Sequence, residues 1–347
     1  MVMGKQQFKT AFVCGLALVL TICFAGTTMA AGKPVVWRLQ SVWTTNSAIH
    51  PITAKMCQNV KERSGGRLEI KLFGPGEIVG SVECLDAVKN GAIEMASSSG
   101  IYNSAKIPEG LIEFGLPFGL ENADQFYEFW YNYKDGENFK MVQEAYREKG
   151  VELIHINGGL SYGYITKFPV ASLADFKGKK IRSFGFFGLV VSFMGGQPVS
   201  LPNEDQFMAL QQGTVDGTIF PYLSMETMKF KEVSKHLVLP PALGSPSSDI
   251  FCSKKAFDAL DPDVQQILRE EARILNKTYL ATEGPQEAEL IANPASHGIT
   301  VDRIPQEEIK NLRLQCMKIW DSTGKKNDRT KAIVANLKAF LKIEEAK

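Results

Sequence analysis

The chain has 347 residues, of which 44% are hydrophobic and 22% are charged, and its 39 basic side chains nearly balance its 38 acidic ones. This balance argues against a nucleic-acid partner and against an anionic membrane surface, because both select for basic patches. A chain of this length exceeds what one hydrophobic core usually serves, so we expect two lobes.

The first 30 residues have the pattern of a cleaved signal peptide. Lys5 and Lys9 flank the start of an apolar run, and Thr28 and Ala30 occupy the small-residue positions of a signal peptidase site. The run is shorter than the roughly 20 apolar residues of a membrane-spanning helix. We therefore predict an exported, periplasmic protein that begins near Ala31 and is not inserted in the membrane.

The cysteines do not have the spacing of a metal site. Two of the six cysteines belong to the predicted leader, and the others, Cys57, Cys84, Cys252 and Cys316, are far apart and form no CxxC motif. Export permits a disulfide, for which Cys57 and Cys84 are nearest in sequence, but buried thiols are the favoured interpretation. The sequence thus predicts no metal and no other cofactor.

Strands alternate with helices through the first half of the chain. The hydrophobic pattern predicts, in chain order, a strand at 35–43, a helix at 48–66, a strand at 67–74, a short helix at 81–91, a strand at 93–99, an aromatic-rich helical region at 123–150 and a strand at 151–156. Because this alternation is typical of crossover connections, we predict an α/β fold with a parallel sheet.

A second set of elements follows a glycine-rich turn. The pattern predicts strands at 162–170, 179–185, 197–202 and 215–222, helices at 183–196 and 203–213, a long helix within 258–290, a strand at 298–305 and a helical C-terminal region. No linker is long enough to separate independent domains. Two lobes of this kind commonly close around a small ligand at the carboxyl ends of strands.

The stretch Gly159–Gly163 reads GLSYG, which is the GxSxG form of a hydrolase nucleophile elbow. An elbow needs a helix after its serine, but the following YGYITKFPV predicts a strand. Only His236 and His297 follow Ser161, and neither lies in a recognisable loop signature. A periplasmic serine hydrolase is therefore an alternative only, and we expect no enzymatic activity; Ser161 and Tyr162 are predicted to offer hydroxyl groups to a ligand.

Arg182 is the residue that the sequence singles out for binding. In the strand that begins at Lys180, Ile181 points to one face while Arg182 points to the other, just before the strand ends and a helix begins. A guanidinium is a planar fork that holds a carboxylate through two parallel hydrogen bonds. The pattern alone also fits an exposed structural arginine.

Three motifs near Arg182 occur in one order. They read LADFKGKKIR, FMGGQPV and EDQFMALQQGTVDG, and together they resemble the central segment of the DctP-type solute receptors of TRAP (tripartite ATP-independent periplasmic) transporters. SGGRLEIKLFGPGEIVG is similar to the first crossover of that family, and LDPDVQQIL to the start of its long helix. The resemblance extends from about residue 35 to residue 280.

The resemblance implies a two-lobed periplasmic solute-binding fold, with a ligand cleft between the lobes and a long helix that links them. It assigns 31–157 with about 246–275 to the first lobe, and 158–245 with about 285–347 to the second. It further implies a monomeric receptor that pairs Arg182 with an organic carboxylate and delivers this solute to a TRAP permease in the membrane. A receptor of the same fold that serves as a sensor input is a further alternative.

The sequence departs from the family pattern after VDG. Many members have Glu-Asn-Pro there, and 2-oxoacid-binding members have Glu-Trp, whereas this chain has Ile219 and Phe220. Because hard cations need oxygen ligands, a metal-bridged ligand is not expected. An apolar or aromatic group could instead stack on Phe220.

The predicted cleft is an apolar slot with a single anchor for an anion. Its predicted residues lie at the ends of strands or in the turns that follow them, and they are Trp43, Tyr102, Ser161, Tyr162, Arg182, Phe184, Phe186, Phe220 and Tyr222. Aliphatic acids, sugar acids and aromatic acids all carry the group that Arg182 would bind, so the sequence leaves the solute open.

Overall fold

The computed structural model describes residues 34–201, 203 and 205–343. The predicted leader at 1–30 lies outside the described residues. Within the described part of the chain, no helix is both long and apolar enough to cross a membrane.

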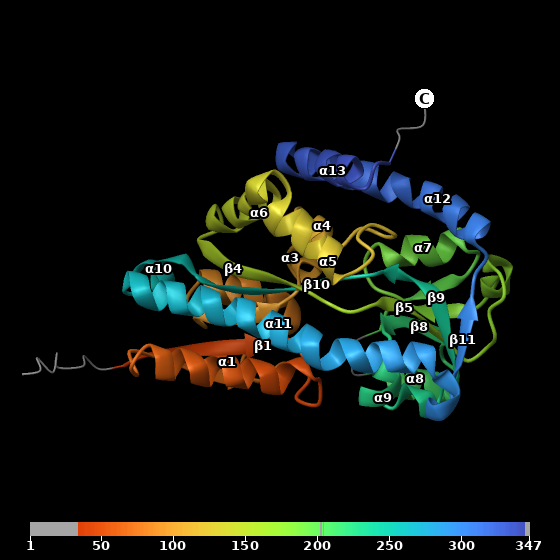
Figure 1. Ribbon diagram of the computed structural model, residues 1–347, viewed down its shortest axis with the longest axis horizontal. Coiled ribbons are helices and arrows are strands. Elements are labelled where there is room, and N and C mark those ends of the chain that lie inside the picture. The colour runs from red at the N-terminus through yellow and green to blue at the C-terminus, as the bar shows by residue number, and fades with distance from the viewer. Residues whose placement is uncertain (1–33, 202, 204, 344–347) are drawn as a thin grey trace, which may run out of the picture. The chain divides into compact units, whose positions relative to one another are not determined.

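Four strands from the first half of the chain and one from the second half form a five-stranded sheet (Figure 1). Its strand order is β2 (Leu68–Phe73), β1 (Val35–Ser41), β3 (Met95–Ser98), β10 (Ser247–Ser253) and β4 (Val151–Gly158). β1 runs parallel to β2 and β3, whereas β10 runs antiparallel to both β3 and β4. The prediction of a parallel sheet is therefore correct for the first three strands and wrong at β10, a strand that the sequence analysis did not identify.

A second, six-stranded sheet lies farther along the chain. Its strand order is β11 (Thr300–Arg303), β9 (His236–Leu243), β5 (Tyr162–Thr166), β8 (Gly217–Pro221), β6 (Lys180–Arg182) and β7 (Gln197–Val199). β5 is antiparallel to β8 and β9, while β6 is parallel to β7 and β8. The sheet is mixed because β5 runs antiparallel to both of its neighbours, whereas β11 and β9 pair in parallel, as do β8, β6 and β7.

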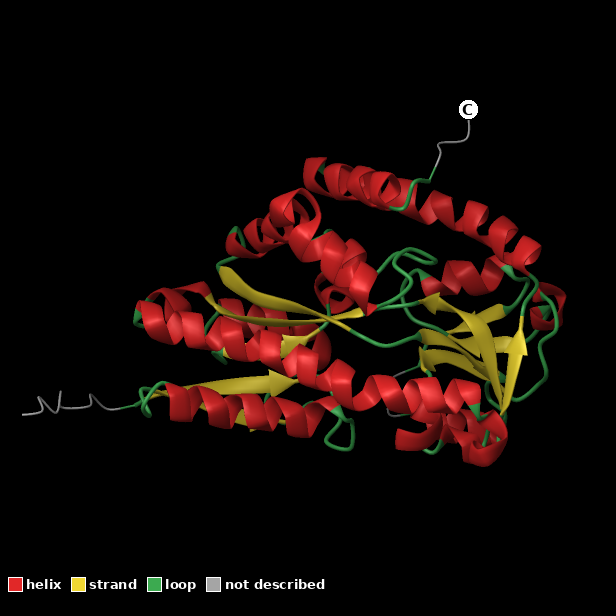
Figure 2. Cartoon of the chain, viewed as in Figure 1, coloured by secondary structure: helices red, strands yellow, loops and turns green. Residues whose placement is uncertain are grey.

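Helices cover both sheets (Figure 2). Those that belong to the first half of the chain are α1 (Ile49–Arg63), α2 (Cys84–Lys89), α3 (Gly100–Asn103), α4 (Gly110–Phe114), α5 (Ala123–Tyr127) and α6 (Glu137–Arg147). Those that follow are α7 (Phe187–Phe193), α8 (Gln206–Gln212), α9 (Ser224–Thr227), α10 (Lys254–Asp258), α11 (Pro262–Ala292), α12 (Gln306–Gly324) and α13 (Asp328–Phe340).

The long helix α11 is confirmed, and it serves both sheets. Its buried stripe of Val264, Leu268, Ala272 and Leu275 belongs to the core beside the first sheet, whereas Leu290 belongs to the core of the second. Of the two helices that end the described chain, α12 contacts α7, and α13 contacts α4 and α6. The predicted lobe boundaries, including the assignment of 285–347 to the second lobe, stay a prediction.

The β4–β5 connection, the β9–β10 connection and α11 all pass from one sheet to the other. The β4–β5 connection bonds to the other two segments at Gly158 and Gly159. The Gly158 amide donates to Asn276 Oδ1 of α11 (2.9 Å), and Asn276 Nδ2 donates to the Gly158 carbonyl (2.7 Å). The next amide, that of Gly159, donates to the Pro246 carbonyl on the β9–β10 connection (2.7 Å). A Cβ at Gly159 would lie 2.6 Å from that carbonyl oxygen, so this crossing requires glycine.

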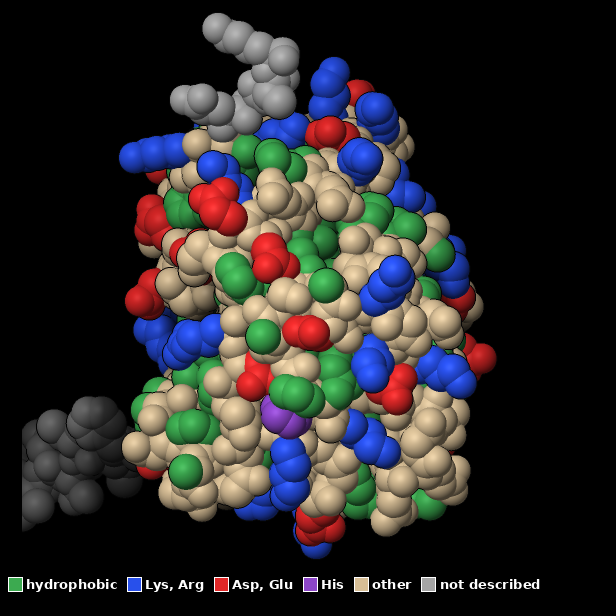
Figure 3. All heavy atoms as spheres, turned by 90° about the vertical axis from the view of Figure 1, so that its right-hand side faces the viewer, with side chains coloured by type: hydrophobic (Ala, Val, Ile, Leu, Met, Phe, Trp, Pro, Cys, Tyr) green, Lys and Arg blue, Asp and Glu red, His purple; other side chains and the backbone are tan. Residues whose placement is uncertain are grey.

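All four cysteines in the described residues are buried and free, and Cys57 and Cys84 do not pair. On the face in Figure 3, basic and acidic side chains are interspersed and hydrophobic ones are scattered.

Candidate functional site

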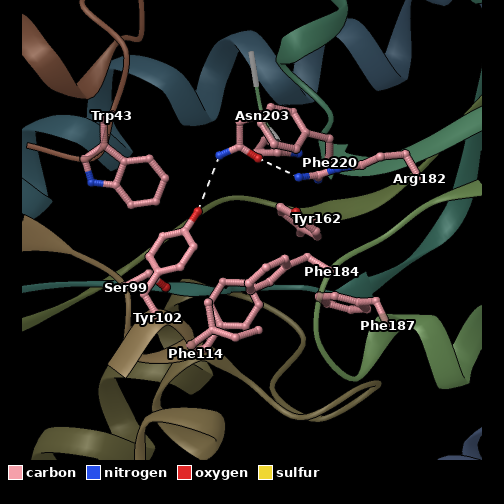
Figure 4. Close-up of a pocket in the computed structure, with 12 residues that line it drawn as sticks. Trp43, Ser99, Tyr102, Phe114, Tyr162, Arg182, Phe184, Phe187, Asn203 and Phe220 are labelled. Carbon is pink, nitrogen blue, oxygen red and sulfur yellow. Dashed lines mark hydrogen bonds between the residues drawn. The ribbon is translucent and has the colours of Figure 1, made fainter. Parts of the chain in front are cut away.

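A cavity of about 60 Å³ is lined by residues from both sheets and the helices that follow them (Figure 4). The side of the first sheet contributes Trp43, Ser99, Ile101, Tyr102 and Phe114. The side of the second sheet contributes Tyr162, Arg182, Phe184, Phe187, Asn203, Phe220 and Pro221. We refer to this space as the inner cavity.

Arg182 is the cation of the inner cavity and ends β6, as predicted. Its side chain is buried, with the residue 3% exposed. Nε and Nη2 donate to the Leu201 carbonyl (3.1 and 3.0 Å), and Nη2 also donates to Asn203 Oδ1 (2.7 Å). Nη1 is buried without a hydrogen-bond partner among the described residues. Because a buried charge is costly unless it is paired, this guanidinium is set up to receive an anion.

Aromatic rings enclose the guanidinium. The Arg182 Cζ atom lies 5.7 Å from the centre of the Phe220 ring, a distance at which cation and ring attract each other. Tyr162 stacks on Phe187 with ring centres 5.5 Å apart and tilts against Phe220 at 5.8 Å. Burial raises the pKa of Tyr162 to about 12, although the nearby Arg182 cation opposes the rise. Tyr162 is therefore a neutral hydroxyl in the cavity wall near neutral pH.

Asn203 connects the two sides of the inner cavity. Its Oδ1 accepts from Arg182, and its Nδ2 donates to the Tyr102 hydroxyl at 3.5 Å (Figure 4). Asn203 lies between β7 and α8, whereas Tyr102 lies in α3. The sequence analysis missed Asn203 because it used no signal for a single polar residue in a loop.

Six of the nine predicted site residues line the inner cavity. They are Trp43, Tyr102, Tyr162, Arg182, Phe184 and Phe220. Ser161, Phe186 and Tyr222 do not line it, so the structure does not bring these three predicted residues to the cavity.

Each of these three residues has another structural place. The Ser161 amide donates to Glu287 Oε1 of α11 (3.2 Å). Phe186 is buried in the core against Phe187, and it is Phe187 that faces the cavity. Tyr222 is fully buried, and its hydroxyl donates to the Val238 carbonyl.

Gly163 in GLSYG explains the position of Tyr222. A Cβ at Gly163 would collide with the Tyr222 ring, so the glycine lets that ring pack across β5.

The stretch after Ser161 is strand β5 and not a helix, as predicted. His236 Nδ1 pairs with Asp302 (3.0 Å) and His297 Nδ1 with Glu226 (2.7 Å), so neither histidine is bonded to Ser161. The structure does not support the serine hydrolase.

No metal-binding cluster is found among residues 34–201, 203 and 205–343, where no group of three His, Cys, Asp or Glu side chains is suitably placed. Ile219 is fully buried in the core, while Phe220 lines the cavity. These two positions supply no oxygen ligand in their side chains.

A fold with two mixed sheets, a long connecting helix and a cavity lined from both sides is that of the two-lobed periplasmic solute-binding proteins. The family model of bacterial extracellular solute-binding proteins, family 7 (DctP), matches residues 39–327. The chain therefore belongs to the DctP family, as the sequence motifs indicated.

Relatives and solved structures are consistent with this assignment. A monocarboxylate 2-oxoacid-binding periplasmic protein of Nostoc sp. is 26% identical over 97% of this chain and 93% of the relative. A 2,3-diketo-L-gulonate-binding periplasmic protein of Escherichia coli is 26% identical over 76% of each chain. A TRAP transporter solute-binding protein from Bordetella bronchiseptica, solved with copurified calcium and picolinate, aligns with a TM-score of 0.80 at 27% identity, covering 90% of this chain and 93% of that one.

Proposed function

We propose that the protein is a periplasmic receptor that binds a small organic carboxylate in the inner cavity and delivers it to a TRAP permease in the membrane. The observation that carries this proposal is the buried Arg182 guanidinium, whose Nη1 has no hydrogen-bond partner among the described residues. A carboxylate is the planar anion that fits the open edge of such a fork.

Different parts of the cavity would bind the carboxylate of the ligand and contact its apolar part. Leu201 and Asn203 fix one edge of the guanidinium, which keeps Nη1 pointing at a defined place. Phe220 and Tyr162 cover the neighbouring space, so a ligand bound there is shielded from water. Shielding strengthens the interaction of the carboxylate with Arg182, because charges attract more strongly in a low dielectric.

The known ligands of relatives support a small organic acid. The Nostoc relative binds 2-oxoacids, the E. coli relative binds 2,3-diketo-L-gulonate, and the Bordetella structure holds picolinate. In this chain Ile219 and Phe220 replace the polar residues that many DctP receptors have after VDG, which favours binding by Arg182 without a bridging metal.

The remaining parts of the proposal rest on the family and on the sequence. Membership of an extracellular solute-binding family and the leader pattern at 1–30 support export to the periplasm. Delivery to a permease, a monomeric state and the absence of catalysis are expected for a receptor of this kind. Sensing in place of transport would require the same binding site, so ligand binding is tested first.

Thermal unfolding of the mature protein with a panel of organic acids tests the proposal. At a ligand concentration about 100-fold above Kd, binding stabilises the folded state by about 2.7 kcal/mol. Arg182→Ala is expected to abolish the stabilisation, because a buried carboxylate without its partner costs about 3–5 kcal/mol. Arg303→Ala is the control, since Arg303 ends β11 in the same six-stranded sheet as Arg182 but is exposed.

Two results would contradict the proposal. One is an Arg182→Ala variant that folds and still binds the acid with near-native affinity. The other is a wild-type protein that no organic acid stabilises while a neutral solute does. Circular dichroism of the variant separates loss of binding from loss of folding.

A further inference from the structure

The inner cavity continues into a larger space, which we call the outer cavity. The two cavities share Trp43, Phe114, Tyr162, Asn203, Phe220 and Pro221 in their walls. The outer cavity has a volume of about 170 Å³ and extends from these residues to α11. Inner and outer cavity therefore form one cleft, with Arg182 at one end.

The volumes limit what each cavity can hold. The inner cavity, at about 60 Å³, is of the size expected for a carboxylate and little more. The outer cavity, at about 170 Å³, is comparable with the roughly 150 Å³ protein cavity that holds benzene. Val42, Leu160, Leu223 and Met228 are among its walls. A six-membered ring or an apolar segment of that size fits there.

Two buried polar side chains in the wall of the outer cavity have an atom without a hydrogen-bond partner among the described residues. Asn157 of β4 is 1% exposed; its Nδ2 donates to Ser248 Oγ (3.4 Å), but its Oδ1 has no partner among the described residues. Ser247 of β10 is 3% exposed, and its hydroxyl is likewise unpartnered there. Both residues line the outer cavity, on paired strands. Buried polar atoms in proteins normally have a hydrogen-bond partner. A ligand bound in the outer cavity can provide that partner here.

Glu283 of α11 adds an acceptor to the same cavity. It is 5% exposed, and one of its oxygens accepts from Gln286 Nε2 (3.3 Å). Burial raises the pKa of this carboxyl. No lysine or arginine is among the described residues that line the outer cavity. The cleft is thus cationic at the Arg182 end and rich in hydrogen-bond acceptors at the other.

We propose that the solute is an elongated acid with a carboxylate at one end and a hydrogen-bond donor, a hydroxyl or an ammonium group, at the other. The carboxylate binds Arg182, the apolar middle packs against Phe220 and Tyr162, and the distal donor reaches Asn157 Oδ1 or Glu283. This inference rests on the proposed function and specifies its substrate class. A simple 2-oxoacid or picolinate carries no distal donor and would leave the outer acceptors unpaired, whereas 2,3-diketo-L-gulonate carries hydroxyl groups beyond its carboxylate.

Calorimetric titration of the mature wild-type protein with four para-substituted phenylacetates tests the inference. The substituents are hydrogen, methyl, hydroxyl and aminomethyl, so that ring and carboxylate stay constant while the distal group changes. The hydroxyl acid is expected to bind roughly tenfold more tightly than the methyl acid, which corresponds to one added hydrogen bond. The aminomethyl acid is expected to bind more tightly still, because its ammonium group pairs with the Glu283 carboxylate. The series needs no variant and therefore does not depend on whether a variant folds.

Two variants distinguish which protein acceptor the distal donor of the ligand reaches. Glu283→Gln is expected to reduce the preference for the aminomethyl acid to near that of the hydroxyl acid, because the charge is lost and an amide stays. Asn157→Leu is expected to remove the hydroxyl preference. Glu289→Gln is the control, since Glu289 lies on the same helix but is exposed. It is expected to change none of the four affinities.

The outcomes separate this inference from the proposed function. Equal affinities for the methyl and hydroxyl acids, or no binding of any phenylacetate while pyruvate binds, would overturn the distal donor site and leave the carboxylate receptor standing. Phenylacetamide that binds as tightly as phenylacetate would overturn the role of Arg182. If no organic acid binds at all, both proposals fail.

Discussion

The two walls of the cleft bury ionisable groups in different ways. On the side of the second sheet, Arg182 is buried with a carbonyl and an amide as partners, and its Nη1 has none among the described residues. Behind the wall of the first sheet, Glu113 and Asp249 are both fully buried next to Tyr146. Arg182 lines a cavity, whereas Glu113 and Asp249 are not among the residues that line it. Glu113 Oε1 and Asp249 Oδ1 are also without partners among the described residues, but their other oxygens are bonded within the protein.

The acid cluster supports the wall from behind. Its members are Asn103 of α3, Glu113 of α4, Tyr146 of α6 and Asp249 of β10. The Tyr146 hydroxyl lies 2.7 Å from Asp249 Oδ2 and 3.1 Å from Glu113 Oε2, and Asn103 Nδ2 donates to Asp249 Oδ2 at 3.1 Å. The neighbours of Asn103 and Glu113 in sequence, Tyr102 and Phe114, line the inner cavity. We infer that the cluster stabilises the fold and positions the wall, whereas Arg182 binds the solute.

Removing the Tyr146 hydroxyl is the largest stability change that we expect. Tyr146→Phe leaves two buried carboxyl groups without their shared partner, which is expected to lower the free energy of unfolding by about 3 kcal/mol. Urea unfolding at neutral pH measures the change. Tyr133→Phe is the control, because Tyr133 is half-buried nearby and its substitution is expected to cost about 0.5 kcal/mol or less.

The same variant tests the distinction between the walls. If the cluster stabilises the fold, Tyr146→Phe that is still folded binds an organic acid with an affinity within about threefold of the wild type. A loss of affinity as large as that of Arg182→Ala would show that the acid cluster takes part in binding, and the distinction would be wrong.

The acid cluster also predicts a pH dependence of stability. Burial raises the pKa of Asp249 to about 6 and the pKa of Glu113 well above its ordinary value, with the neighbouring Asp249 charge adding to the second shift. Because both pKa values are higher in the folded than in the unfolded state, the folded state binds more protons. The stability that this provides is complete below about pH 4 and is lost as the pH rises through about 6.

Comparison of wild type and Glu113→Gln isolates this effect from that of His155. Burial lowers the pKa of His155 to about 3, so His155 costs stability as the pH falls below about 6.5, in the opposite direction. Glutamine at position 113 cannot ionise, so the free energy of unfolding of the variant relative to wild type is expected to rise between about pH 5 and about pH 8. A difference that stays constant over this range would contradict the raised pKa of the cluster.

The site could be predicted where it depended on local sequence. Arg182 lies at the end of β6 and lines the inner cavity, and strand alternation and the end of β6 are both set by neighbouring residues. Phe186 does not line the inner cavity, because the start of α7 turns the neighbouring Phe187 ring toward it instead. Tyr222 does not line it either, because β8 ends at Pro221 and the Tyr222 ring packs back over Gly163.

The rest of the site depended on pairings between distant segments. β10 inserts between β3 and β4 and pairs Ser248 with Asn157, although these two residues are 91 positions apart. No local pattern marks such a partner. The outer cavity and the acid cluster both use β10, so neither could be predicted without its position in the sheet. The fold class and the long helix were predictable because each rests on repeated local patterns.

Substitution of Asn203 is expected to change the free energy of unfolding least. It tests whether the two walls of the cleft are joined in the protein without ligand. Its bond to the Tyr102 hydroxyl is 3.5 Å long, whereas its bond to Arg182 is 2.7 Å. Because a hydrogen bond of 3.5 Å is weak, Asn203→Ala is expected to lower the free energy of unfolding by only about 0.5–1 kcal/mol, chiefly through Arg182. Tyr102→Phe serves as the matched variant, since it removes only the hydroxyl, and is expected to cost less than Asn203→Ala. Equal losses in urea unfolding for both variants, and no further loss in the double variant, would show instead that the Asn203 bridge couples the two walls strongly.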